Sequence, residues 1–105
     1  MSYEEITAML AESGLPFAYH HFAEGESPEP PFLVYLIPGS NNFSADGIVW
    51  LKVKQLDIEL YTDRKDPVME EKVEAVLDAH GLFYNRTETW IESEKMYEVL
   101  YELEV

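Results

Sequence analysis

The chain has 105 residues and a formal net charge of −14, which arises from 21 acidic and seven basic residues. A surface of this sign repels phosphate backbones and anionic lipids, so we expect no direct binding of nucleic acid and no membrane association. The absence of cysteine excludes disulfides and thiol chemistry, and a hydrophobic content of 47% excludes a disordered acidic tail.

The N-terminal residues predict a helix that begins after Ser2. Ser2 and Glu5 have the spacing of a capping box, in which each residue satisfies a backbone amide of the other. The apolar side chains that follow recur on one helical face, at Ile6, Met9 and Leu10. Gly14 and Leu15 predict a Schellman-type end for this helix.

Two apolar segments, Phe17–Phe22 and Phe32–Ile37, predict strands. The residues between them, Ala23–Pro31, are acidic and rich in proline. We therefore expect the two strands to pair as a hairpin with a wide, stiff loop.

The ten residues Pro38–Gly47 predict a loop, because turn-forming residues lie at both ends. One interpretation is a surface loop whose single aromatic residue, Phe43, is tucked onto the core. The other is a projecting loop that docks on a neighbouring molecule, with Phe43 as its anchor. Under the second interpretation the candidate partner-binding residues are Asn41, Asn42, Phe43 and Asp46.

The segment Ile48–Tyr61 changes its hydrophobic phase. Apolar residues occupy odd positions from Val49 to Val53 and even positions from Leu56 to Leu60. A regular strand cannot keep both sets on one face. We expect either a bulge or bend near Lys54-Gln55, or two separate strands.

A second helix is predicted to begin at Asp66-Pro67, an N-cap residue followed by proline. Its apolar stripe consists of Met69, Val73, Val76 and Leu77, and we expect Glu70, Glu71, Glu74 and Asp78 on the opposite side. Gly81 and Leu82 predict a Schellman end.

The last third of the chain predicts a hairpin of Leu82–Ile91 and Lys95–Val105, joined by a turn at Glu92–Glu94. Its final strand alternates with a period of two residues. The residues expected to point inward are Tyr97, Val99, Tyr101, Leu103 and Val105, and those expected to point outward are Glu98, Glu102 and Glu104.

These elements predict an α+β fold in the order α-β-β-β-α-β-β, with two helices packed on one face of a mainly antiparallel sheet. We expect residues 1–105 to form a single domain, because a chain of this length rarely divides.

Motifs of common catalytic sites are absent: the sequence has no glycine-rich phosphate loop, serine elbow, CxxC or HExxH. We therefore expect a non-enzymatic protein without a cofactor or metal. His20 and His21 are adjacent in a predicted strand, where their side chains would point to opposite faces and could not chelate one ion. A small metal-dependent enzyme that uses His20 or His80 is the weakest alternative.

Four stretches resemble small structural proteins of phages and prophages of Gram-positive bacteria: Phe32–Tyr35, Asn42–Asp46, Ile58–Pro67 and Trp90–Glu94. The resemblance is to the head–tail joining group, and within it to the tail terminator, or tail completion, proteins. It implies a ring, usually a hexamer, that caps the tail tube and meets the head connector. It further implies assembly in the host cytoplasm and a place in the virion, with copies of the chain and other tail or connector proteins as partners.

DNA would have to pass through such a ring, and a lumen lined with carboxylates would offer phosphate no attractive site. Glu98, Glu102 and Glu104 are candidates for this lining, and the alternative is that they form only the solvated face of a half-buried sheet. A functional class of a different kind also remains open. It is an acidic adaptor domain that binds one protein partner, or a DNA-mimicking inhibitor.

Overall fold

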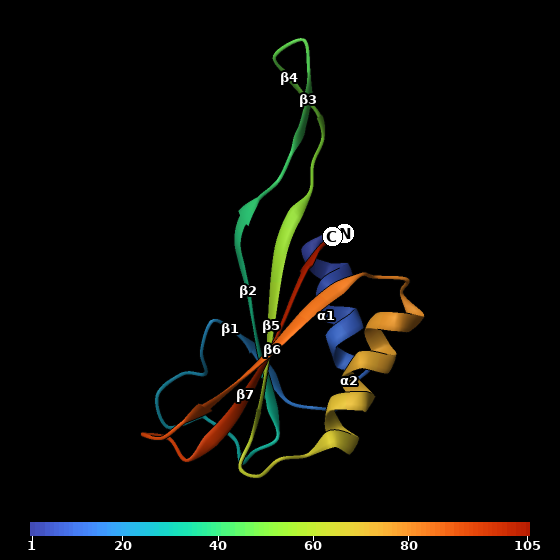
Figure 1. The fold of residues 1–105 in the computed structure, drawn as a ribbon. Helices are drawn as coiled ribbons and strands as arrows, with labels where there is room; N and C mark the ends of the chain where they lie inside the picture. Colours follow the sequence, from blue (N-terminus) through green and yellow to red (C-terminus); the bar gives the residue numbers. More distant parts are fainter.

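The structure, a computed structural model, describes residues 1–105. Two helices lie on one side of a five-stranded sheet with the strand order β1-β2-β5-β7-β6 (Figure 1). The bounds of these elements are α1 Tyr3–Ala11, α2 Pro67–Ala79, β1 Phe17–Tyr19, β2 Phe32–Ser40, β5 Lys54–Thr62, β6 Tyr84–Ile91 and β7 Met96–Glu104. The α+β class and the mainly antiparallel sheet agree with the prediction, and the order of elements agrees except for two additional short strands before β5. Neither helix has the length and apolar character needed to cross a membrane.

The core lies between the helices and the central strands β5 and β7. Each of these strands contributes every second residue to the core, because side chains alternate between the two faces of a sheet. The strand residues are Leu56, Ile58, Leu60, Val99, Tyr101 and Leu103, and the helices add Ile6, Met9, Leu10, Val73 and Leu77. Burial of each large apolar side chain stabilises the fold by about 1.5–3 kcal/mol, so the two helices are held mainly by these contacts.

The predicted helix caps form, with one difference. Ser2 and Glu5 make a complete capping box, and the carboxylate of Asp66 accepts a hydrogen bond from the Met69 amide at 3.1 Å. At the end of α2 the Leu82 amide donates to the Leu77 carbonyl, as in a Schellman motif. The end of α1 instead uses the buried Ser13 hydroxyl, which donates to the Leu10 carbonyl and accepts from the Leu15 amide.

The first two strands are parallel, so the predicted hairpin of Phe17–Phe22 and Phe32–Ile37 was wrong. β1 contains only three residues, and Phe17 lies opposite Leu33. The connection of residues 20–31 is long enough to return the chain to the starting end of the strand, as a parallel pair requires. Edge-to-face packing on Tyr35 accompanies this direction, with ring centroids at 5.1 Å for Tyr19 and 6.2 Å for Phe17.

The segment Pro38–Gly47 is not a loop, contrary to the prediction. β2 continues to Ser40, and the chain then forms a second, two-stranded sheet of β3 (Phe43–Ala45) and β4 (Ile48–Leu51). Asp46 and Gly47 join these strands with φ angles of 54° and 75°, and two positive φ angles are typical of a type I′ hairpin turn. We call residues 41–53 the arm; it extends away from the rest of the molecule (Figure 1).

The change of phase within Ile48–Tyr61 corresponds to two strands, which was one of the two alternatives predicted. β4 ends at Leu51 and β5 begins at Lys54. Between them, Lys52 and Val53 lie outside both ladders. Because of this interruption, β5 pairs with β2 and β7 of the main sheet, whereas β4 pairs only with β3 of the arm.

Glu70 is buried, whereas the sequence pattern placed it on the solvent side of α2. Its residue exposure is 5%. Its carboxylate oxygens lie 2.5 Å from the Arg86 guanidinium and 2.7 Å from the Lys65 ammonium. Hydrophobic periodicity cannot identify such a position, because the two cations come from outside the helix. The ion pairs connect α2 to the edge strand β6.

The packing of α2 can be tested with Val73→Asp. Val73 is 3% exposed and belongs to the core, so an aspartate there would bury an unpaired charge and lower the free energy of unfolding by several kcal/mol, roughly 3–5. Val68→Asp is the matched control, because Val68 lies on the same helix with 75% exposure. Urea unfolding of both variants measures the difference. Equal stability of Val73→Asp and the wild type would contradict this placement of the helix.

Candidate functional site

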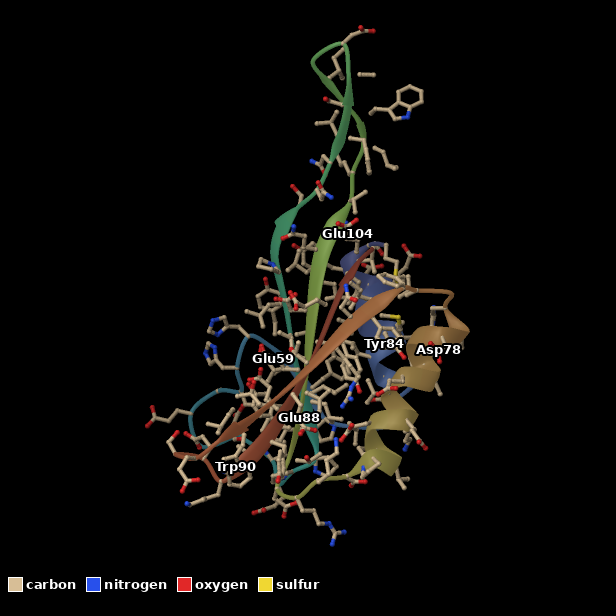
Figure 2. All side chains as sticks on the ribbon, in the orientation of Figure 1. Glu59, Asp78, Tyr84, Glu88, Trp90 and Glu104 are labelled. Carbon is tan, nitrogen blue, oxygen red and sulfur yellow. The ribbon has the colours of Figure 1, made fainter.

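The arm exposes an unusual amount of apolar surface. Trp50 is 79% exposed and Phe43 is 55% exposed, and their exposed apolar neighbours are Ile48, Val49 and Leu51. Figure 2 shows side chains leaving the arm on both sides, beyond the reach of the core. Phe43 is therefore not tucked onto the core, and the projecting interpretation matches its position. Monomeric proteins rarely expose a contiguous apolar patch of this kind unless it binds something.

Two of the four predicted partner-binding residues instead fasten the base of the arm. The side-chain amide of Asn41 donates to the Glu104 carboxylate at 3.0 Å, and the Asn42 side-chain oxygen accepts from the Val53 amide at the same distance. Asp46 occupies the turn at the tip. Phe43 is thus the predicted residue whose position best suits an apolar contact. The predicted partner-binding residues did not include Ile48–Leu51, although the Asp46-Gly47 pair between apolar runs is a strong hairpin signal.

A second surface lies on the side of the sheet opposite the helices, which we call the open face. Glu98, Glu102 and Glu104 lie there, because Val99, Tyr101 and Leu103 between them point into the core. The structure adds Asp57 and Glu59 from β5 to the same face, since Leu56, Ile58 and Leu60 point the other way. The alternation of β5 was visible in the sequence and could have identified both.

A tyrosine hydroxyl joins two of these carboxylates. The Tyr61 hydroxyl oxygen lies 2.6 Å from a Glu59 oxygen and 3.0 Å from a Glu98 oxygen. A hydroxyl has one proton to donate, so it cannot satisfy two ionised carboxylates at once. Partial burial, and secondarily the Glu98 charge, raise the pKa of Glu59 above its ordinary value, although the hydrogen bond from Tyr61 opposes the shift. Burial and the two carboxylates also raise the pKa of the Tyr61 hydroxyl.

Asp57 and Glu102 form a pair of like charges on the open face. They lie directly opposite each other in the ladder between β5 and β7. Partial burial, followed by repulsion from Glu102, raises the pKa of Asp57. Like charges in this position are unfavourable for pairing of the strands, so the open face lowers the stability of the isolated chain.

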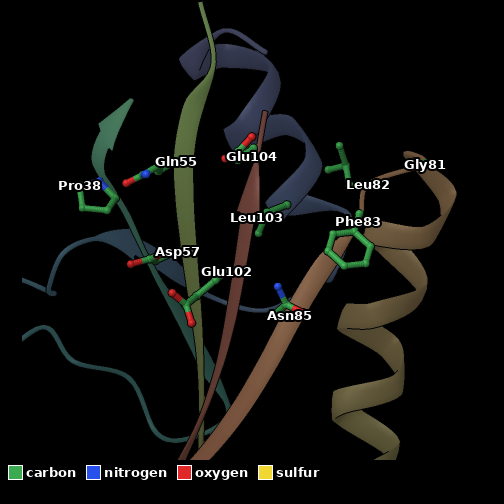
Figure 3. A pocket seen from close by; sticks show the side chains of 10 residues that line it. All are labelled: Pro38, Gln55, Asp57, Gly81, Leu82, Phe83, Asn85, Glu102, Leu103 and Glu104. Atoms are coloured by element: carbon green, nitrogen blue, oxygen red, sulfur yellow. The ribbon is translucent and has the colours of Figure 1, made fainter. Parts of the chain in front are cut away.

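A shallow pocket of about 660 Å³ begins beside this pair and extends toward the end of α2 (Figure 3). The carboxylates of Asp57, Glu102 and Glu104 line one part of it, and Leu82 and Phe83 line another. Its charged groups are all acidic, so the pocket disfavours phosphate and other anions.

The histidines do not have the geometry expected for a strand. His20 follows β1 with a φ angle of 65°, and its Nδ1 lies 2.9 Å from the Nδ1 of His21. The prediction that the two side chains point to opposite faces was therefore wrong, because the chain leaves the sheet after Tyr19. His80 caps the end of α2, and its Nε2 lies 2.5 Å from a Glu12 carboxylate oxygen.

Comparison of the sequence with models of known protein families and with curated proteins gives no match. The candidate site therefore rests on geometry. It comprises an apolar arm and an acidic open face, which meet where Asn41 binds Glu104.

The raised pKa of Asp57 predicts the effect of Asp57→Asn. A carboxyl whose pKa is raised in the folded state binds its proton more tightly there than in the unfolded state. The free energy of unfolding therefore falls as the pH rises through the range between the unfolded and folded pKa values. The variant should therefore be more stable than the wild type at pH 7, by roughly 0.2–1 kcal/mol. This difference should shrink as the pH falls and vanish at about pH 3, well below the ordinary aspartate pKa, where Asp57 is protonated in both states.

Urea unfolding between pH 3 and pH 7 measures this effect of Asp57→Asn, with Glu94→Gln, at an exposed turn, as the control. If Asp57→Asn is less stable than the wild type at pH 7, the Asp57 charge stabilises the folded state and the prediction is wrong.

Proposed function

We propose that this chain is a non-enzymatic structural protein of a phage or prophage. In this proposal it belongs to the tail terminator, or head–tail joining, group and forms a ring at the end of the tail tube. The ring contains copies of this chain, with a hexamer as the expected form, and contacts other tail or connector proteins. It assembles in the host cytoplasm and becomes part of the virion.

The observation that carries the proposal is the exposed apolar arm. The arm contributes nothing to the core, so stability of the isolated chain does not account for its apolar side chains. Burial against another molecule does account for them, and a ring needs one surface on each copy that contacts a different surface on the next. The resemblance in Phe32–Tyr35, Asn42–Asp46, Ile58–Pro67 and Trp90–Glu94 supports the phage assignment.

The open face supports the second part of the proposal, which concerns passage of DNA. Asp57, Glu59, Glu98, Glu102 and Glu104 form a carboxylate surface on one side of the sheet. Such a surface, turned toward the lumen, would give the phosphates of a passing DNA duplex no site at which to bind. The proposal therefore orients the open face toward the axis of the ring.

The same carboxylates favour a second candidate function. An acidic adaptor, or a DNA-mimicking inhibitor, would present them to a basic protein partner. The two functions differ in oligomeric state, since the adaptor would act as a monomer that captures a basic DNA-binding protein.

Native mass spectrometry and negative-stain electron microscopy over a range of protein concentrations test the ring. We expect closed rings at high concentration. The control, Val68→Ser, removes an exposed apolar side chain from α2 and should form the same rings. A chain that stays monomeric at every concentration, and instead binds a basic protein such as a histone-like DNA-binding protein, would contradict the ring and favour the adaptor.

The lumen assignment is tested by Lys at Glu98, Glu102 and Glu104 together, introduced into the encoding phage or prophage. Particles should assemble but eject or retain DNA abnormally, because a basic lumen would bind the duplex. The matched control replaces Glu24, Glu26 and Glu29 with Lys. These substitutions make the same change in charge on an exposed loop. Normal infectivity of particles that contain the first triple variant would refute the lumen assignment.

A further inference from the structure

The arm is apolar on both of its faces. β4 contains four consecutive apolar residues, Ile48-Val49-Trp50-Leu51, and all four are exposed. The ladder between β3 and β4 shifts its register at Trp50, so side chains do not alternate without interruption along β4. Ile48 pairs with Ala45 and Leu51 pairs with Phe43, so these residues share one face, whereas Val49 pairs with Ser44 on the other face. A two-stranded sheet with one covered face would show polar residues at every second position instead.

Continuous apolar runs of this kind are typical of strands that are buried on both faces. The five exposed side chains together present on the order of 500 Å² of apolar surface, from about 150–250 Å² for each fully buried aromatic. One partner in a standard protein interface buries about 800 Å². The arm alone therefore offers more than half of what one partner contributes, but only if both faces are covered.

The charge distribution indicates what covers the arm. Between Glu29 and Asp57 the chain has one acidic residue, Asp46, and two basic residues, Lys52 and Lys54. The arm itself, residues 41–53, contains only Asp46 and Lys52 of these and is neutral, so the rest of the chain, which we call the body, carries the full charge of −14. Two bodies of this chain repel each other, whereas the arm meets such a body without repulsion. Another copy of the chain is thus a partner of suitable charge, while a basic protein would be drawn to the body instead.

We infer that the arm of each copy is buried on both faces between other copies of the same chain. The inference rests on the proposed ring and adds the mode of contact: each arm inserts as a two-sided wedge rather than lying flat on one neighbour. Lys52 follows β4 directly, so the arm has one cation next to its apolar residues for an acidic neighbour.

Two double variants test the faces: Ile48→Thr with Leu51→Thr on the face of Phe43, and Val49→Thr with Trp50→Thr, which changes the opposite face and the residue at the register shift. Threonine keeps the preference for a strand while removing apolar surface. Each double variant should raise the concentration needed for ring assembly at least about tenfold, as measured by native mass spectrometry. Val68→Ser is the control and should assemble as the wild type does. Thermal unfolding of the monomer should hardly change, because no arm residue belongs to the core.

Fluorescence of Trp50 gives an independent measurement. In a Trp90→Phe background Trp50 is the one remaining tryptophan, and its emission should shift to shorter wavelength as rings form. Assembly of either double variant at the wild-type concentration would overturn the two-sided contact while leaving the ring intact. Failure of the wild type to assemble would refute the ring itself and, with it, other copies as the partner.

Discussion

The antiparallel pairing of β5 with β7 is the contact on which the rest of the structure depends. Eight consecutive residue pairs join the two strands without a bulge, from Gln55–Glu104 to Thr62–Tyr97. Since side chains alternate, this register sends leucine, isoleucine and valine toward the helices and carboxylates toward the open face. A slip by one residue would exchange the two sets and bury the charges. The position of the helices and the acidity of the open face therefore have one common origin.

The arm depends on the same pairing without contributing to the core. It continues from β2 and β5, which are neighbours in the sheet, and its base is held by Asn41, Asn42 and the backbone of Val53. The direction of the arm is thus set by the body, while its apolar side chains remain available. The core and the exposed apolar surface therefore use different residues.

Charge and apolar surface act over different distances in such a molecule. Repulsion between acidic bodies is screened beyond about 8 Å at physiological ionic strength, whereas apolar burial requires direct contact. In the proposed ring, a near-neutral arm would let two copies touch while their carboxylates stay apart. The like-charge pair Asp57–Glu102 and the shared Tyr61 hydroxyl have a cost in the stability of the monomer, and the helix-side core offsets it.

The sequence by itself determined the elements whose signals are local. The capping box at Ser2, the Asp66-Pro67 start of α2, the C-terminal hairpin and the outward glutamates of β7 all depend on residues within a few positions of one another, so local patterns identify them. The break between β4 and β5 was likewise visible as a change of phase.

Only the tertiary structure decided the features that depend on distant partners. Parallel pairing of β1 with β2 required packing on Tyr35, burial of Glu70 required Arg86 and Lys65, and the arm required the sheet to hold its base. The resemblance to tail terminator proteins comes from the sequence alone, and the function that it implies is a proposal. The exposed faces of the arm are a fact of the structure, because exposure is a property of the whole folded chain rather than of any segment.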